Sequence, residues 1–518
     1  MHLYAIPNLR LPQFAWITAV DRSSGVVTLV HGRSVEVRTN FFIEGVWNGP
    51  FANGDFGETD CVFGTGGIIT DQSVRFVTSA STLDCLYYAE DHSLLHVSNS
   101  LPLLLARLED RLDPHCPDYP RICDSILHGI NEYEREIPTK NGRVHQLMYR
   151  NLSVSSEKIF ESEKRMPPRF TSFEEYKTYR WNSYALIAAN ARDLARSQPL
   201  EIWSTQSTGY DCTAINVMAG AFGLNKVFTV SQGKSNAHLA HFDSANQPDD
   251  DGGRICEWLG LDYVRINRRA FAQGFEEEYL YYCGRHINQD ANLLEIGRRV
   301  SKPGLLLTGV HGEILYSNNS VVRPPFLDST LKRDDIAGHG MGELRLTVGF
   351  IHCPVPFIGA RRKPDIVNIT ESSEMDPWRL GNSYDRPIAR RIAEDAGIPR
   401  EFFGQSKIGS VVIFAQPSIP YGSALRREFF DYLANEGILG KRQRYLWPVV
   451  RWVNSMLALK SEQRFAVIHD AERIVSKLIG RTFNFKLLWP HLDGALYCFC
   501  INRTADCRAN VLRSGAES

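Results

Sequence analysis

The hydrophobic pattern divides the chain into two parts of different texture. Residues 1 to about 150 contain many short apolar runs between turns, which is typical of β-strands. We expect strands at residues 26–30, 34–37, 74–77, 85–88 and 94–97. Helical periodicity is sparse here, so this part is expected to consist mainly of β-sheets.

A polar link at residues 153–164, followed by Pro167 and Pro168, is the best candidate for a domain boundary. Beyond it, predicted helices alternate with short apolar strands. The helices are expected at residues 173–197, 211–221 and 251–259, and the strands at residues 200–203, 227–230, 263–266 and 305–307. This alternation predicts an α/β fold with a parallel sheet covered by helices. Residues 442–479 are expected to be rich in helix.

Composition limits the kinds of partner. The chain has 518 residues, of which 43% are hydrophobic and 23% charged, and its formal charge is -1. A near-neutral charge gives no general attraction to nucleic acid or to an anionic membrane. No stretch reaches the roughly 20 apolar residues of a membrane span, and no signal peptide is recognisable. The odd count of eleven cysteines suggests reduced thiols, and we expect a cytoplasmic protein.

The most informative segment is residues 202–213. An apolar strand ends at Ser207, Thr208 and Gly209, and a helix follows, so that backbone N–H groups converge where the helix dipole favours an anion. Gly209 allows close approach of the backbone, and Asp211 places a carboxylate where Mg²⁺ could join it to phosphate oxygens. The same residues, taken alone, fit equally well an ordinary turn with Asp211 at a helix start.

This segment resembles the PP-loop of the asparagine synthetase superfamily, whose pattern is Ser-Gly-Gly-x-Asp-Ser. Further blocks resemble that family and follow in its order. They are residues 227–231 with 251–261, which in the family border the adenine; 308–315, beside the pyrophosphate; 339–345 with 356–358; and 390–407, which supply a lysine. The resemblance implies an ATP-pyrophosphatase domain over residues 170–518.

The resemblance also implies roles for individual residues. The residues expected to bind ATP or pyrophosphate are Ser207, Thr208, Gly209, Tyr210, Asp211, Cys212, Val230, Gly309 and Arg390. Asp211 and Glu313 are the candidate Mg²⁺ ligands, and Lys407 is expected to offset charge on the departing pyrophosphate. Glu343 falls where β-lactam synthetase carries the acid of a Tyr and Glu pair. Arg390 and Arg391 either hold phosphate or a substrate carboxylate, or line a solvated helix face.

Three departures from the family pattern concern the site. Thr208 puts a β-branched side chain at a glycine position of the loop. Cys212 places a thiol near a helix N-terminus, where we expect a lowered pKa. The metal-binding Asp of the family aligns with Gly312, which leaves His311 and Glu313 as the nearest polar candidates.

The first part of the chain has a second resemblance. Residues 74–77, 86–89 and 94–98 resemble a hairpin of glutamine amidotransferase domains, which implies an Ntn-hydrolase-like αββα sandwich over residues 1–160. The chemistry of that domain requires a cysteine at position 2, where this chain has His2, and Cys61 is internal. We therefore expect no glutaminase activity. Superfamily members without that cysteine include β-lactam synthetase and lasso peptide cyclases.

The expected function is that of an ATP- and Mg²⁺-dependent, AMP-forming ligase. It would adenylate a carboxylate or carbonyl oxygen of a small-molecule or peptide substrate and couple it to an amine. Two alternatives stay open: an amidotransferase that takes ammonia or sulfur from a partner and acts on a sugar or tRNA, and a non-catalytic scaffold. A nitrogen-donor partner and a homodimer are also left open.

Overall fold

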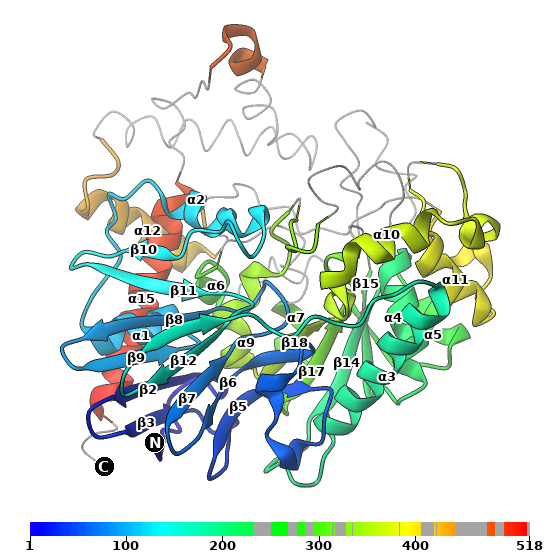
Figure 1. Cartoon of the computed structure of the whole chain (residues 1–518). Coiled ribbons are helices and arrows are strands. Elements are labelled where there is room, and N and C mark those ends of the chain that lie inside the picture. Colours follow the sequence, from blue (N-terminus) through cyan, green and yellow to red (C-terminus); the bar gives the residue numbers. More distant parts are fainter. Residues whose placement is uncertain are drawn as a thin grey trace.

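Three β-sheets organise this mixed α/β protein (Figure 1). The computed structural model describes residues 1–231, 250–267, 277–284, 294–312, 315, 328–333, 335–382, 384–405, 419–420, 422–440, 474–481 and 492–514. The predicted helix-rich stretch 442–479 lies mostly outside the described residues, and its described end, residues 474–479, is helical.

The first sheet has seven strands. In spatial order they are β1 (His2–Pro7), β3 (Val26–His31), β2 (Trp16–Asp21), β9 (Leu94–Ser98), β8 (Leu86–Asp91), β11 (Arg143–Leu147) and β10 (Glu136–Pro138). Only the β1–β3 pair is parallel. β8 and β9 pair as an antiparallel hairpin, whereas residues 74–77, which were grouped with it, form part of a strand in the second sheet.

The second sheet has six antiparallel strands and packs face to face on the first. Its strands are β13 (Ile159–Ser162), β12 (Asn151–Ser155), β7 (Ser73–Val77), β6 (Val62–Ile69), β5 (Phe41–Trp47) and β4 (Glu36–Val37). Between the sheets, the ring of Trp16 lies 4.9 Å from that of Phe42 and 6.2 Å from that of Phe76. Alternating apolar positions of both sheets thus meet in a shared core.

The third sheet confirms the predicted parallel sheet. Its order is β16 (Tyr263–Asn267), β15 (Lys226–Ser231), β14 (Glu201–Gln206), β17 (Gly304–Thr308) and β18 (Phe350–Pro354), and all four pairings are parallel. Figure 1 shows several helices gathered beside it: α3 (Phe173–Ala191), α4 (Tyr210–Gly220), α5 (Gly253–Trp258) and α11 (Pro387–Asp395). The edge strand β18 lies against β5 and β6 of the second sheet.

The strand order of this sheet has a topological switch point. From β14 the chain moves through β15 to β16 on one side, and then continues with β17 and β18 on the other. β14 and β17 are therefore neighbours whose onward connections lead in opposite directions. In open parallel sheets, ligands bind outside the carboxyl ends of the strands at such a switch point.

The remaining helices connect the sheets. They are α1 (Leu101–Leu108), α2 (Tyr119–Asp124), α6 (Glu278–Tyr281), α7 (Leu294–Gly297), α9 (Gly342–Val348), α10 (Lys363–Glu371), α12 (Ser423–Asn435) and α15 (Asp493–Ser514). Short 3₁₀ turns occur at residues 51–53, 56–58, 125–128, 339–341, 355–357, 360–362, 373–378 and 400–402. α15, which the sequence pattern did not predict, packs along α1, and α1 in turn packs on β8, β9 and β2 of the first sheet.

One predicted helix is too long. Residues 173–197 were expected to be helical, but α3 ends at Ala191. There the backbone N–H of Arg192 is shared among the carbonyls of residues 188–190, and the buried Arg196 guanidinium donates to the carbonyls of Asn190 and Gly45, at 2.7 Å each. This arginine fixes the turn that leads into β14.

All eleven cysteines are free thiols. In the described part of the chain, no helix combines the length and hydropathy that a membrane span requires.

Candidate functional site

The candidate phosphate loop lies between the end of β14 and the start of α4. The N–H of Gly209 donates to Ser207 Oγ at 3.1 Å, and Thr213 Oγ1 donates to the carbonyl of Gly209 at 2.7 Å. Asp211 stands in the first turn of α4. The predicted strand-to-helix turn is therefore present, with the loop at the carboxyl end of β14, at the switch point of the sheet.

Thr208 is held by an acid that sequence reasoning did not assign. Its N–H and its hydroxyl both donate to Asp250 Oδ1, at 3.0 and 2.7 Å. Asp250 is buried and directly precedes the segment that opens α5. Thr208 thus connects the loop by two hydrogen bonds to the segment that precedes α5. The only signal in the sequence is its place in the acidic run of residues 249–251.

Two glycines after β17 bring a second segment against Asp211. A Cβ atom at Gly312 would stand 2.4 Å from Asp211 Cγ, and one at Gly309 would stand 2.9 Å from Asp211 Cβ. Gly312 N–H closes the turn by donating to the carbonyl of Gly309 at 3.0 Å. The backbone of this turn therefore lies against the carboxylate of Asp211, and a side chain at Gly312 would collide with it.

Asp211 forms an ion pair with Arg386, which the sequence analysis did not identify. Arg386 is buried at the N-terminal end of α11, and its guanidinium lies 5.2 Å from the centre of the Tyr384 ring. No local pattern could reveal this contact, since it joins residues far apart in the chain.

Arg390 is fully buried, so the solvated helix face considered for it is wrong. It donates to the Tyr210 hydroxyl and pairs with Glu394 Oε1 at 3.0 Å, and its guanidinium lies 4.9 Å from the centre of the Tyr210 ring. Arg391 points elsewhere: it lies over Phe173 at 4.0 Å and pairs with Glu374 at 2.8 Å. Arg390 thus positions the loop through Tyr210.

The segment that leads towards Lys407 is anchored on the loop. Gly404 N–H donates to the carbonyl of Thr208 at 2.9 Å. Gly404 has φ +64°, and a Cβ there would lie 2.4 Å from Tyr210 Cζ, so only glycine fits. Lys407 itself lies outside the described residues, as does Glu313. Val230 is half-buried near the carboxyl end of β15, where the resemblance expects an adenine contact.

The expectation of a lowered pKa for Cys212 is wrong. Burial raises the pKa of this thiol, and the neighbouring Asp211 carboxylate adds to the effect. Its Sγ lies 3.8 Å from Thr205 Oγ1. The cost of removing the thiolate from water therefore exceeds any benefit from the start of α4.

Glu343 lies in the first turn of α9. It lines a cavity of about 60 Å³ together with Asp84, Tyr87 and Asn99 of the first part of the chain and His339 and Arg345 of the second. Burial raises the pKa of Glu343 and lowers that of His339 to about 3. Among the described residues, Asp84 Oδ2, Glu343 Oε2 and His339 Nε2 have no hydrogen-bond partner. The cavity can therefore accept hydrogen bonds from water or from a small ligand.

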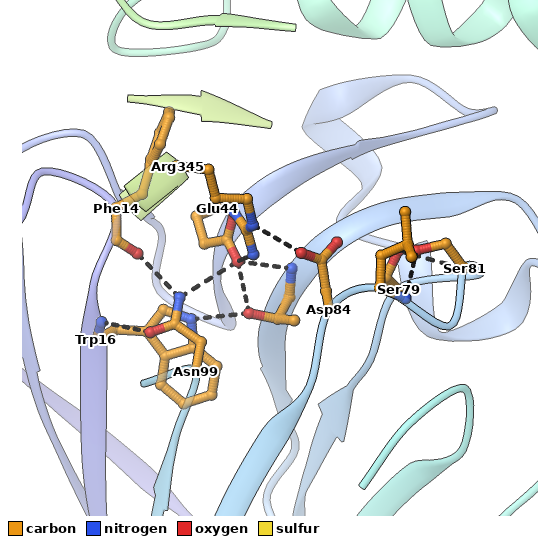
Figure 2. Close-up of polar contacts among 10 residues, drawn as sticks. Phe14, Trp16, Glu44, Ser79, Ser81, Asp84, Asn99 and Arg345 are labelled. Carbon is orange, nitrogen blue, oxygen red and sulfur yellow. Dashed lines mark hydrogen bonds and ion pairs between the residues drawn. The ribbon is translucent and has the colours of Figure 1, made fainter. Parts of the chain in front are cut away.

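The wall beside this cavity is a buried polar network (Figure 2). Arg345 Nε donates to Asp84 Oδ1 at 2.6 Å, and its terminal nitrogens donate to Glu44 at 2.8 and 3.0 Å. Asn99 Nδ2 donates to the same Glu44 carboxylate at 3.2 Å. The network links α9 to β5 of the second sheet and to Asp84 and Asn99, which flank the β8–β9 hairpin of the first sheet.

His311, like Glu313, is a polar residue next to Gly312 that the sequence analysis considered for the site. It is 3% exposed, has φ +72°, and stacks on Phe357 with 4.7 Å between ring centres. Burial, together with the nearby charges of Arg333 and Lys363, lowers the pKa of His311 well below its ordinary value.

Of the two candidate Mg²⁺ ligands, Asp211 and Glu313, the structure describes Asp211. No group of three or more His, Cys, Asp or Glu side chains within the described ranges is arranged to hold a metal ion. A Mg²⁺ ion bound through Asp211 would take its other ligands from phosphate oxygens and water, which is the usual way proteins bind it with nucleotides. The Asp211 carboxylate fits this way of binding Mg²⁺, and the metal ion would then replace the guanidinium of Arg386 as its partner.

The geometry thus brings the loop at the start of α4, the carboxylate of Asp211 and two glycines together at one switch point. No protein-family model matches this chain, and no curated protein matches it.

Proposed function

We propose that the protein is an ATP-dependent ligase that forms AMP and pyrophosphate, with a PP-loop domain of the asparagine synthetase type. One observation carries the proposal: the loop after β14 and the glycine turn after β17 meet at the switch point of the parallel sheet, around Asp211. A switch point of this kind is the expected place for a nucleotide in such a sheet.

The loop residues have matching roles in this proposal. The N–H groups at the start of α4, with the Ser207 hydroxyl, receive the phosphates of ATP, and the bare backbone at Gly309 and Gly312 packs against Asp211 and holds its carboxylate in place. A substrate oxygen attacks the α-phosphorus, pyrophosphate leaves, and an amine then displaces AMP. Mg²⁺ bound with the nucleotide supplies charge neutralisation at the phosphates. Lys407 and Glu343 remain the proposed catalytic residues.

The first two sheets fit the accompanying proposal of an Ntn-hydrolase-like sandwich that lacks its nucleophile. His2 begins the edge strand β1 and is exposed. Cys61 is buried, and burial raises the pKa of its thiol well above the ordinary value. Neither residue supports a thiolate nucleophile beside a free amine, so the nitrogen comes from the substrate or from a partner.

A second candidate is a non-catalytic scaffold, and the ion pair between Arg386 and Asp211 favours it. A carboxylate already neutralised by a buried arginine is a poorer metal ligand than a free one. The two candidates differ in one respect: only the ligase converts ATP to AMP.

The test is to incubate the purified protein with Mg²⁺ and α-labelled ATP, together with panels of amino acids, small carboxylic acids and short peptides, and to measure AMP and pyrophosphate. The proposal expects both products, formed in equal amounts. Asp211→Asn should lower the rate by at least about a hundredfold, the scale of losing a charge-stabilising group. Asp262→Asn is the matched control. Asp262 is exposed and directly precedes β16, at the amino ends of the strands, so this substitution should leave the rate of AMP formation unchanged. Persistent absence of AMP would favour the scaffold.

A further inference from the structure

The strand β1 forms an open edge of the first sheet. None of its six residues is buried, and among the described strands only β3 pairs with it. Its outward side chains are apolar: Tyr4 is 63% and Ile6 is 37% exposed, and Leu9, two residues beyond the strand, is 77% exposed. Residues 2–9 contain no Lys, Arg, Asp or Glu. An exposed, uncharged edge of this kind is a template for pairing with another strand.

The other described sheet edges differ from β1. In the first two sheets, β10 has three residues and carries Glu136, β13 carries Glu161, and β4 has two residues. In the third sheet, β16 carries Arg265 and β18 lies against the second sheet. Short length, charge and cover by neighbouring structure are the usual means by which proteins prevent edge pairing. Among the described edges, β1 thus combines length, exposure and lack of charge.

The backbone groups of β1 that remain open follow from its pairing with β3. The N–H groups of His2 and Asn8 donate to carbonyl groups at the two ends of β3, at 2.8 Å each. Successive residues of a strand direct their backbone groups to opposite sides, so the even-numbered residues bond to β3. The N–H and C=O groups of Leu3 and Ala5 therefore point away from the sheet. Pro7 has no N–H group to donate.

We propose that β1 pairs with the β1 strand of a second copy of this chain, antiparallel and about a two-fold axis at Tyr4. Leu3 and Ala5 lie one residue before and one residue after this axis. Leu3 of each copy then faces Ala5 of the other, and each such pair exchanges two hydrogen bonds. The same groups of both copies satisfy each other, as a symmetric dimer interface requires.

The side chains suit the same register. The two Tyr4 residues lie opposite each other in a non-hydrogen-bonded pair, in which side chains approach most closely and an aromatic pair is stabilising. Ile6 lies opposite His2 of the other copy. On the inner face, Leu3 and Ala5 already pack against the core between the first two sheets, so pairing extends this core across the axis. The backbone and the side chains thus favour a second copy as the occupant of this edge.

The first test measures the mass of the full-length protein in solution by gel filtration with light scattering. The wild type should have twice the mass of one chain. Tyr4→Lys should reduce the mass to that of one chain without changing the circular dichroism spectrum, because it places two like charges opposite each other. Leu9→Lys is the matched control: Leu9 is more exposed but lies beyond the paired residues, so this variant should stay dimeric. A wild type with the mass of one chain, or a dimer that persists in Tyr4→Lys, would overturn the proposal.

The second test is cross-linking, in a Cys507→Ser background that removes the exposed native thiol. Tyr4→Cys should form a disulfide between copies under mild oxidation, because opposite residues of a non-hydrogen-bonded pair have Cα atoms about 4.5 Å apart, within the range of disulfides. Leu9→Cys should not. If the wild type is a dimer and Tyr4→Cys cross-links no more than Leu9→Cys, the copies associate through another surface and the pairing of β1 is wrong. Neither test depends on ATP, so the proposed function is tested separately.

Discussion

Arg345 on α9 donates a hydrogen bond from each terminal guanidinium nitrogen to the carboxylate of Glu44 on β5, at 2.8 and 3.0 Å (Figure 2). Both side chains are almost fully buried, with 3% and 0% of their surface exposed. Asp84 accepts the third hydrogen bond of the same guanidinium, at 2.6 Å. One arginine of the later part of the chain therefore neutralises two acids of the first part.

The first prediction concerns this contact. Arg345→Met should lower the free energy of unfolding by about 3–5 kcal/mol, because it leaves two buried acids without their counter-charge. Denaturant unfolding followed by circular dichroism measures the change. Arg143→Met removes an ion pair between side chains that are 64% and 50% exposed, and should cost less than about 1 kcal/mol. Equal effects of the two substitutions would contradict the importance assigned to Arg345.

The second prediction concerns the ion pair between Arg386 and Asp211. Arg386→Gln should let Mn²⁺ bind without nucleotide more tightly than it binds the wild type, because the carboxylate of Asp211 loses its competing cation. Titration followed by electron paramagnetic resonance measures free Mn²⁺. Arg391→Gln, on the same helix but paired with Glu374, is the control. The gain should disappear when Asp211→Asn is added; a gain that persisted would place the metal elsewhere.

The third prediction is a pH dependence caused by Lys164. This lysine is 4% exposed and donates to Asn151 Oδ1 at 2.8 Å, and burial lowers its pKa from 10.5 to about 7. Between these values the unfolded chain binds more protons than the folded protein, so the contribution of Lys164 to stability increases as the pH rises from about 7 towards 10. Thermal unfolding of Lys164→Met should lack this part of the rise. The exposed Lys140→Met should retain it, and parallel profiles for all three proteins would be evidence against the buried lysine.

The fourth prediction concerns thiol reactivity. Since burial raises the pKa of Cys212, this residue should react with iodoacetamide at pH 8 more slowly than the exposed Cys507. Mass spectrometry of peptides after short exposures gives the order. Modification of Cys212 before Cys507 would restore the reactive thiolate that the sequence suggested.

Local patterns in the sequence were enough to predict the parallel sheet. The predicted helix 211–221 is observed as Tyr210–Gly220, and the predicted strand 263–266 as Tyr263–Asn267. These elements follow from apolar periodicity and from glycines that limit the helices. α15 was missed because its burial depends on α1, which lies far away in the sequence.

The partners of the loop could not be predicted in this way. Asp250 and Arg386 reach Thr208 and Asp211 only through folding, across 42 and 175 positions of the chain. Gly312 was first interpreted as a lost metal ligand, although its contact with Asp211 gives a physical reason for glycine. The reason for a glycine at this position therefore becomes visible only when the contacts of its backbone are known.

The central claim is that the switch point around Asp211 binds the phosphates of ATP. The most direct measurement is calorimetric titration with α,β-methylene-ATP and Mg²⁺, in which the bond to be cleaved is blocked, for the wild type, Asp211→Asn and Asp262→Asn. The account predicts saturable binding to the wild type and to Asp262→Asn, and an affinity at least about tenfold weaker for Asp211→Asn. Absence of binding to the wild type, or equal affinity for Asp211→Asn, would contradict it.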